Sequence, residues 1–303
     1  MINGFINVLK PPGMTSHDIV GFIRYNLHMK QVGHAGTLDP GAAGVLPVAV
    51  GKATRLIEYL SDAGKSYRAE ILLGYETDSG DDTGKVLNKD LDFIMPDKET
   101  VLKALEEFKG EITQVPPAHS AIKINGHRAC DLLRRGIEVE IPSRQVVIHK
   151  LELLGIKDDR NCGGTANILI DADCSKGTYI RSLCADIGAK LGIPATMSFL
   201  VRTRVGDFPL EKAYSIEEIK AEIEKTENEE YSFVNKAEDY LSHLRRYQLN
   251  PARQKAFCNG LSSNDYKFEG SEQALLVYSN DVFLGVGRYD SKNKSIVPVK
   301  ILL

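Results

Sequence analysis

The chain has 303 residues, of which 43% are hydrophobic and 26% are charged, and its formal net charge is −3. This length and apolar content suit one large globular domain, alone or with a small appendage. The apolar runs are far shorter than the roughly 20 residues that span a bilayer, and residues 1–5 carry no charged segment. The five cysteines are scattered and never spaced as C-x-x-C. We therefore expect a cytoplasmic protein without a targeting segment, a membrane span, a disulfide framework or a zinc ribbon.

The charge is distributed unevenly along the chain. Residues 216–240 contain nine acidic residues and three lysines, a net of −6, so the remainder sums to +3. Between positions 123 and 150 the basic side chains gather: Lys123, Arg128, Arg134, Arg135, Arg144 and Lys150. Such a cluster is compatible with phosphate contacts, and a solvated surface is the alternative interpretation.

The first half of the chain alternates short strands and helices. A strand is expected to end at Lys10, before the turn at residues 11–13. Ser16 can cap the next helix, in which apolar residues follow helical spacing up to Leu27. We then predict a strand over 45–50, a short helix over 52–60, a strand over 66–74 that carries Tyr67, and a helix over 97–109.

Two long strands and one amphipathic helix dominate the second half. Segments 145–156 and 165–174 are predicted to pair, and a helix starts next to Tyr179 and ends at Gly192. Tyr179 and Arg181 therefore lie at a helix N-terminus beside a strand end. From about residue 245, β-like runs over 274–278, 282–288 and 295–301 predict a small β-rich domain.

The run from Gly33 to Pro47 is turn-rich and contains His34 and Asp39. Its glycines permit a close approach of a ligand, and Pro40 biases Asp39 towards an extended backbone. The run therefore presents a carboxylate, although a plain turn explains Asp-Pro-Gly equally well. His34 and Asp39 have no third ligand nearby, and the chain contains neither a P-loop nor a G-x-G-x-x-G, so we expect no metal and no cofactor.

Several ordered motifs resemble those of the TruB-type tRNA pseudouridine synthases. They are Lys10-Pro11 with Gly13-Met14-Thr15-Ser16, Gly33-His34-Ala35-Gly36-Thr37-Leu38-Asp39-Pro40, Lys65-Ser66-Tyr67-Arg68-Ala69, Pro116-Pro117-Ala118-His119-Ser120-Ala121-Ile122-Lys123, and Ser175-Lys176-Gly177-Thr178-Tyr179-Ile180-Arg181. The resemblance covers roughly residues 2–210, and the tail is similar to the PUA-like RNA-binding domain of those enzymes.

The resemblance implies an α+β fold in which helices flank a mixed, largely antiparallel central sheet. It implies a catalytic domain over 1–240, with a mobile RNA-binding loop over 123–150, and a PUA-like domain over 245–303. The implied activity is isomerisation of uridine to pseudouridine at position 55 in the T loop of tRNA, by a monomer that needs no cofactor and no guide RNA. A non-catalytic RNA-binding protein and a guide-dependent subunit are the alternatives.

The resemblance also assigns roles to individual residues. Asp39 matches the essential aspartate, which acts as a nucleophile or base at C1′, at C6 or through the C2′ proton. Arg181 matches its ion-pair partner, Tyr67 the tyrosine that stacks on the base and assists proton transfer, and Tyr179 a residue that lines the pocket. His34 matches the side chain that fills the gap left by the flipped nucleotide. An ordinary structural role is the alternative for Arg181, Tyr67, Tyr179 and His34.

Other matched positions imply weaker assignments. Lys10 either braces the loop, approaches phosphate or is solvated, and Leu200 either forms an apolar wall for uracil or is a core leucine. Contacts to the RNA backbone are expected from Lys123, Arg128, Arg134, Arg135 and Arg144. Three positions depart from the family pattern and bear on substrate contacts: Val201, His119 and Cys130.

Overall fold

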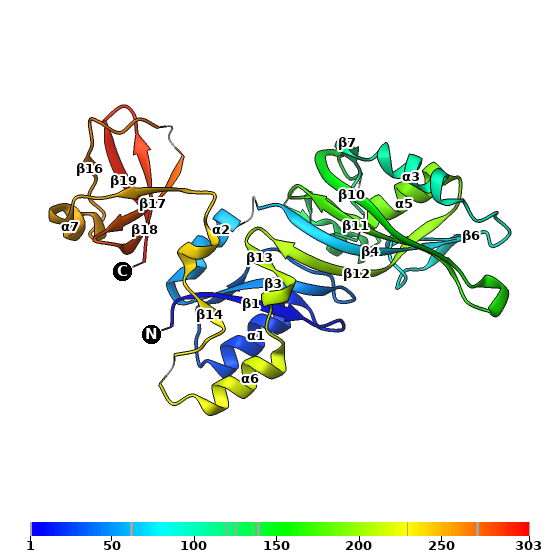
Figure 1. Cartoon of the computed structure of the whole chain (residues 1–303), viewed down its shortest axis with the longest axis horizontal. Helices are drawn as coiled ribbons and strands as arrows, with labels where there is room; N and C mark the ends of the chain where they lie inside the picture. The colour runs from blue at the N-terminus through cyan, green and yellow to red at the C-terminus, as the bar shows by residue number, and fades with distance from the viewer. Residues whose placement is uncertain are drawn as a thin grey trace.

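The computed structural model describes residues 2–60, 63–117, 119–120, 122–124, 126–134, 136–137, 140–228, 230–270 and 273–302 (Figure 1). A large mixed sheet with helices forms the first part of the chain, and a smaller β-rich unit forms its C-terminal part (Figure 1). No helix in the described ranges is long and apolar enough to cross a membrane.

A ten-stranded sheet organises the larger part. Its main path runs β14-β1-β3-β12-β4-β11-β10-β7, with β2 added to β3 and β13 added to β12. The strands are β1 (Gly4–Lys10), β2 (Val32–His34), β3 (Ala43–Val50), β4 (Lys65–Leu73), β7 (Gly110–Gln114), β10 (Arg144–Asp158), β11 (Ala166–Cys174), β12 (Ala195–Val205), β13 (Phe208–Pro209) and β14 (Val234–Asn235). Within the described residues β3 and β12 pair in parallel and the other neighbours are antiparallel, which confirms the expected mixed, largely antiparallel sheet.

Helices cover the sheet and close its cores. They are α1 (Ser16–Asn26), α2 (Ile57–Leu60), α3 (Lys98–Glu106), α5 (Ile180–Leu191) and α6 (Ile216–Lys225). The apolar stripe of α5 is buried in the core cluster that also contains Tyr67 and Leu200. Because Gly192 adopts a left-handed conformation, α5 ends where the sequence predicts.

Two local predictions were wrong in detail. The N-cap of α1 is Thr15, which forms a capping box with Asp18 and leaves the Ser16 hydroxyl for another partner. Residues 51–56 form a 3-10 helix ahead of α2, in which the Thr54 hydroxyl donates to the Gly51 carbonyl at 2.8 Å.

The basic segment 123–150 is also more structured than a loop. It contains the hairpin of β8 (Lys123–Ile124) and β9 (His127–Arg128), the helix α4 (Ala129–Arg134), and the first seven residues of β10. Residues 144–148 pair with β7, and Val146 and Ile148 are buried, so residues 144–150 belong to the sheet. A second hairpin, β5 (Tyr75–Thr77) with β6 (Val86–Lys89), lies next to the sheet.

The C-terminal unit is the expected β-rich domain. Its five strands follow the order β15-β17-β18-β19-β16, and α7 (Gln254–Cys258) packs beside them. The strands are β15 (Arg245–Gln248), β16 (Ser263–Asn264), β17 (Ala274–Ser279), β18 (Val282–Asp290) and β19 (Ser295–Ile301). Leu276 and Val286 of this unit share a buried cluster with Phe5 and Leu56 of the larger part, and Lys300 pairs with Glu58 at 2.9 Å. One apolar interface therefore joins the two parts.

Candidate active site

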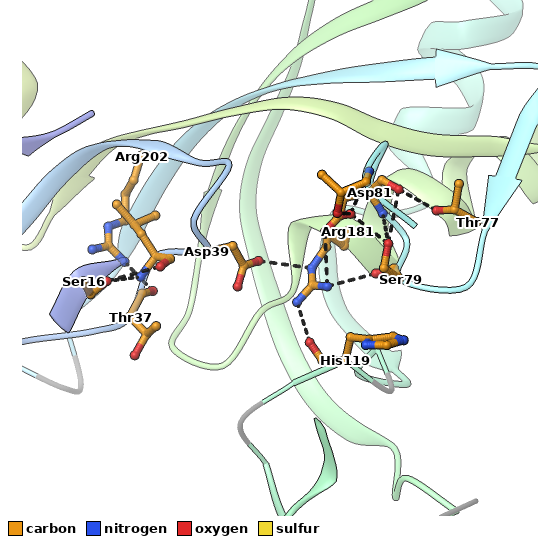
Figure 2. Close-up of polar contacts among 11 residues, drawn as sticks. Ser16, Thr37, Asp39, Thr77, Ser79, Asp81, His119, Arg181 and Arg202 are labelled. Carbon is orange, nitrogen blue, oxygen red and sulfur yellow. Dashed lines mark hydrogen bonds and ion pairs between the residues drawn. The ribbon is translucent and has the colours of Figure 1, made fainter. Parts of the chain in front are cut away.

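Asp39 lies at the tip of a tight turn between β2 and β3. The Ala42 amide donates to the Asp39 carbonyl at 3.1 Å, which closes the turn through Pro40 and Gly41. The Asp39 side chain is 44% exposed and points towards Arg181 (Figure 2). The two interpretations of this segment, a plain turn and a loop that presents a carboxylate, therefore describe the same structure.

The turn rests on side chains from the first motif of the chain. The Ser16 hydroxyl accepts from the Leu38 amide at 2.9 Å and lies 3.2 Å from the Leu38 carbonyl oxygen, to which it donates. The Pro40 carbonyl accepts from the Gly13 amide at 2.8 Å and from Lys10 Nζ at 3.2 Å. The residues on both sides of Asp39 are thus hydrogen-bonded to the segment between β1 and α1.

Lys10 is fully buried, so it is not a solvated lysine. Its ammonium donates to the carbonyls of Pro11 at 2.8 Å, Met14 at 2.7 Å and Pro40 at 3.2 Å. Burial lowers the pKa of Lys10 from 10.5 to about 8, and the charge of Asp39 opposes part of that fall. Because three carbonyls surround its ammonium, Lys10 stabilises the turn from inside the protein. This geometry does not fit the expected placement of Lys10 among the substrate-binding residues.

Arg202, on β12, holds the loop from the other side. It is 1% exposed, and it donates to the carbonyls of Val45 at 2.8 Å, Thr37 at 3.2 Å and Gly36 at 3.1 Å. Gly44 permits the close pairing of the β3 and β12 backbones at Arg202, since its φ is +111° and a Cβ there would lie 2.2 Å from the Arg202 carbonyl oxygen. The sequence interpretation gave Arg202 no role, because an arginine in a strand is usually at the surface.

Arg181 connects the loop to the rest of the site. Its Nε lies 3.2 Å from Asp39 Oδ2, and its Nη1 lies 3.4 Å from Asp81 Oδ2. Nη1 also donates to the Ser79 carbonyl at 2.9 Å, and Nη2 donates to the His119 carbonyl at 3.0 Å (Figure 2). The side chain is only 6% exposed. The predicted ion pair with Asp39 is present, and the departure at His119 leaves it intact because the contact is to backbone.

Asp81 is a site residue that the sequence interpretation missed. Its Oδ1 accepts from the Ser79 hydroxyl at 2.8 Å and from the Thr83 hydroxyl at 2.6 Å, which leaves Oδ2 for Arg181. The dense run of acidic and turn residues over 78–84 was the available signal. A buried arginine thus lies between two carboxylates, one exposed and one fixed.

Tyr67 and Leu200 form the apolar side of the site. Tyr67 on β4 is 9% exposed and Leu200 on β12 is 7% exposed, and both belong to the core cluster that includes Leu38 beside Asp39. Burial raises the pKa of Tyr67, and the charge of the Arg202 guanidinium opposes the rise. Both residues belong to the core cluster that reaches the Asp39 loop through Leu38.

Tyr179 is held by two contacts outside the family motifs. The Gln114 side chain donates to its carbonyl at 3.0 Å and accepts from its amide at 2.8 Å. The Arg144 guanidinium lies 5.0 Å from the centre of its ring. Arg144 was expected at the RNA backbone; here it stacks on Tyr179 because β10 begins at Arg144 and runs beside the end of β11.

Where the structure describes them, the remaining predicted residues make no hydrogen bond or ion pair with Asp39. His34 ends β2 rather than lying in a loop, and burial, with the charge of Arg202, lowers its pKa, which favours a neutral imidazole. The backbones of Lys123, Arg128 and Arg134 belong to β8, β9 and α4, whereas Arg135 lies outside the described residues, as do the side chains of the other three.

The geometry suits chemistry on a ligand that enters from solvent. The Asp39 carboxylate is ion-paired on one side and accessible on the other, so it is placed for nucleophilic or base chemistry. Buried apolar side chains lie on one side of the loop and a half-buried aromatic ring, Tyr179, lies at the start of the helix that carries Arg181.

Comparison with known proteins places this fold and site in a class. The chain is similar to a chain in the solved structure of an H/ACA RNP bound to a substrate RNA containing 2′-deoxyuridine, with a TM-score of 0.73, 25% identity, and coverage of 99% of this chain and 85% of that one. The fold is thus that of the pseudouridine synthases.

The sequence comparisons are more specific. The family model for the N-terminal domain of TruB family pseudouridylate synthases matches residues 24–180, and that for the C-terminal domain of tRNA pseudouridylate synthase B matches residues 181–247. The chain belongs to the TruB family of pseudouridylate synthases. Relatives named tRNA pseudouridine synthase B include that of Alkaliphilus oremlandii, 41% identical over 99% of this chain and 98% of the relative, and that of Clostridioides difficile, 41% identical over 97% of each.

Proposed function

We propose that this enzyme isomerises uridine to pseudouridine at position 55 in the T loop of tRNA, with Asp39 as the group that acts on the nucleotide. The observation that carries the proposal is the accessible Asp39 carboxylate paired with the buried Arg181, at 3.2 Å, in a member of this family. The relatives that match along nearly the whole chain are named tRNA pseudouridine synthase B, which supports tRNA as the substrate.

The chemistry requires a nucleotide removed from the RNA stack. Flipping a base costs a few kcal/mol, and stacking of an aromatic side chain returns roughly 1–3 kcal/mol, which is the role proposed for His34. Burial keeps the His34 imidazole neutral, which favours stacking over proton donation. We propose that the flipped uridine lies between Asp39 and an apolar surface made of Tyr67, Tyr179 and Leu200.

In the proposed reaction the N1–C1′ bond breaks and a C5–C1′ bond forms. Asp39 adds to C1′ or to C6, or removes the C2′ proton, while the uracil stays in the pocket and turns. Carbon C5 then loses its proton, with Tyr67 as the proposed acceptor, and N1 gains one. The product is an isomer of the substrate, so no cofactor or water is consumed.

The test is incubation of the protein alone with an unmodified tRNA transcript, followed by mapping of pseudouridine. Asp39→Asn should abolish the product and leave the affinity for tRNA within about threefold, because the carboxylate acts in the chemistry. Absence of product at the T loop from the unaltered protein would refute the proposal. A large loss of affinity in Asp39→Asn would contradict the chemical role of Asp39.

This experiment also separates the alternatives. A non-catalytic RNA-binding protein would bind tRNA without product, and a guide-dependent enzyme would act only after a guide RNA is added. We favour the stand-alone monomer, since the chain matches the bacterial relatives over 97–99% of its length at 41% identity and the RNP chain at 25%. A reducing cytoplasm is compatible with the free cysteines among the described residues, which are Cys162, Cys174, Cys184 and Cys258.

The basic segment is proposed to bind the RNA backbone and to move when it does so. Replacing Arg134 and Arg135 together with alanine should weaken tRNA binding and reduce the salt dependence of binding, because phosphate contacts release counterions. An unchanged salt slope would assign these arginines to the solvated surface.

A further inference from the structure

Arg202 makes contacts that connect two parts of the active site. Three of its nitrogen atoms donate to backbone carbonyls at 2.8–3.2 Å: those of Gly36 and Thr37 in the Asp39 loop and that of Val45 in β3. On β12 it lies directly opposite Tyr67 of β4 in the strand register, and the guanidinium charge lies close enough to the tyrosine hydroxyl to oppose the rise in its pKa. One side chain therefore contacts both the loop that presents the carboxylate and the tyrosine on the neighbouring strand.

The burial of Arg202 is unusual for a cation. It is 1% exposed, and within the described part of the chain no carboxylate forms an ion pair with it. A buried charge is costly, and among the described residues its hydrogen-bond acceptors are three backbone carbonyls. A hydrophobic residue of similar volume would avoid that cost, so the contacts of the guanidinium serve something other than packing.

The planar guanidinium explains why arginine is needed at this place. It offers five donors in a fixed fork, so several acceptors are held at fixed distances from one another. A lysine carries the same charge on a single nitrogen at the end of a flexible chain. Because its donors radiate from one atom, a lysine cannot reproduce the three contacts that Arg202 makes through separate nitrogens to the carbonyls of residues 36, 37 and 45.

We infer that Arg202 is a positioning residue that holds the Asp39 loop and Tyr67 in one fixed arrangement, and that it thereby sets the rate of the chemical step without contacting RNA. The inference rests on the proposed function of Asp39 and Tyr67. Loss of alignment by about 1 Å can reduce the rate of a reaction by about 100-fold, so fixed separation is of direct consequence.

The experiment compares Arg202→Lys with the matched control Arg204→Lys, two residues along β12. Arg204 is 41% exposed in its side chain and pairs with Asp173 at 3.5 Å, so it shares the strand and the charge but not the loop contacts. With enzyme in excess over unmodified tRNA, Arg202→Lys should slow the single-turnover rate constant by about 30- to 100-fold. Its Kd for tRNA should remain within about threefold, and Arg204→Lys should resemble the unaltered enzyme.

A double-mutant cycle with Tyr67→Phe adds a readout that a purely structural role would not change. If Arg202 acts through Tyr67, removing the hydroxyl should slow the Arg202→Lys enzyme less than it slows the unaltered enzyme. Multiplicative effects of the two changes, a rate within threefold of normal, or a loss confined to affinity would each overturn the inference. Inactivity of the unaltered enzyme would instead refute the proposed function.

If Arg202→Lys does not fold, Tyr67→Phe tests the same link from the other end. Loss of the hydroxyl should loosen the guanidinium and increase amide hydrogen exchange in the peptide spanning residues 35–42, with little change in α3. Unchanged exchange in that peptide would overturn the inference.

Discussion

Replacing Lys10 with methionine should change how the stability of the protein depends on pH. Lys10 is fully buried, and its ammonium is hydrogen-bonded to the carbonyls of Pro11, Met14 and Pro40. Its pKa is about 8 in the folded protein, against 10.5 for a lysine in an unfolded chain, because burial disfavours the charged form. Methionine retains the shape of the aliphatic stem and removes the titrating group.

The sign follows from the proton counts. Between pH 8 and 10.5 the unfolded chain holds the Lys10 proton and the folded chain releases it, so the unfolding free energy rises with pH over this range. Each unit of pH contributes about 1.4 kcal/mol, so the rise amounts to at most about 3.5 kcal/mol. Below pH 8 both states hold the proton, and this contribution is absent.

The assay is urea unfolding of the wild-type and Lys10→Met proteins at pH 7, 8, 9 and 10. The unfolding free energy of the wild-type protein minus that of Lys10→Met should increase with pH, because the other titrating groups are the same in both proteins and cancel. Lys98→Met, at an exposed position in the first turn of α3, should show no such trend. A difference that stays flat or falls would mean that the three carbonyls hold the proton as firmly as water does. If Lys10→Met does not fold, an NMR titration of the Lys10 amine in the unaltered protein should give a midpoint near 8.

Two further variants test the supports of the site. Asp81→Asn should slow single-turnover pseudouridine formation by about 10- to 100-fold with little change in tRNA affinity, because Arg181 loses its fixed carboxylate. The control is Asp82→Asn, at the adjacent and more exposed position. Equal effects from the two substitutions would contradict this role of Asp81. Gln114→Leu should lower the unfolding free energy by about 1–3 kcal/mol, because it leaves the part-buried Tyr179 amide without its acceptor and the Tyr179 carbonyl with the Leu183 amide as its remaining donor. Thermal or urea unfolding measures the change, and an unchanged midpoint would show that water replaces the Gln114 side chain.

The sequence was sufficient to predict the elements that carry clear local patterns. Alternating apolar residues marked β4, β10 and β11, and the Gly192 stop signal marked the end of α5. The ion pair between Asp39 and Arg181 was predictable because both residues stand in recognisable motifs.

The supports of the site were not predictable, because they depend on contacts between distant segments. Asp81 reaches Arg181 across 100 positions of sequence, and Arg202 reaches Gly36 across 166. Ser16 was predicted as the helix cap, but its neighbour Thr15 also carries a hydroxyl that can cap a helix. Local sequence does not decide which of the two hydroxyls does so. The stacking of Arg144 on Tyr179 likewise requires the register of β10.

The parallel pairing of β3 with β12 has a consequence for how the enzyme comes into being. It joins residues 43–44 to residues 201–202, so the Asp39 loop obtains its donors from Arg202 only after two thirds of the chain has been made. Contacts this distant in sequence form late, because the intervening chain must first be ordered. A nascent or truncated polypeptide that ends before β12 therefore carries every residue of the Asp39 motif and still lacks a fixed active site, which ties the onset of activity to near-completion of the catalytic fold.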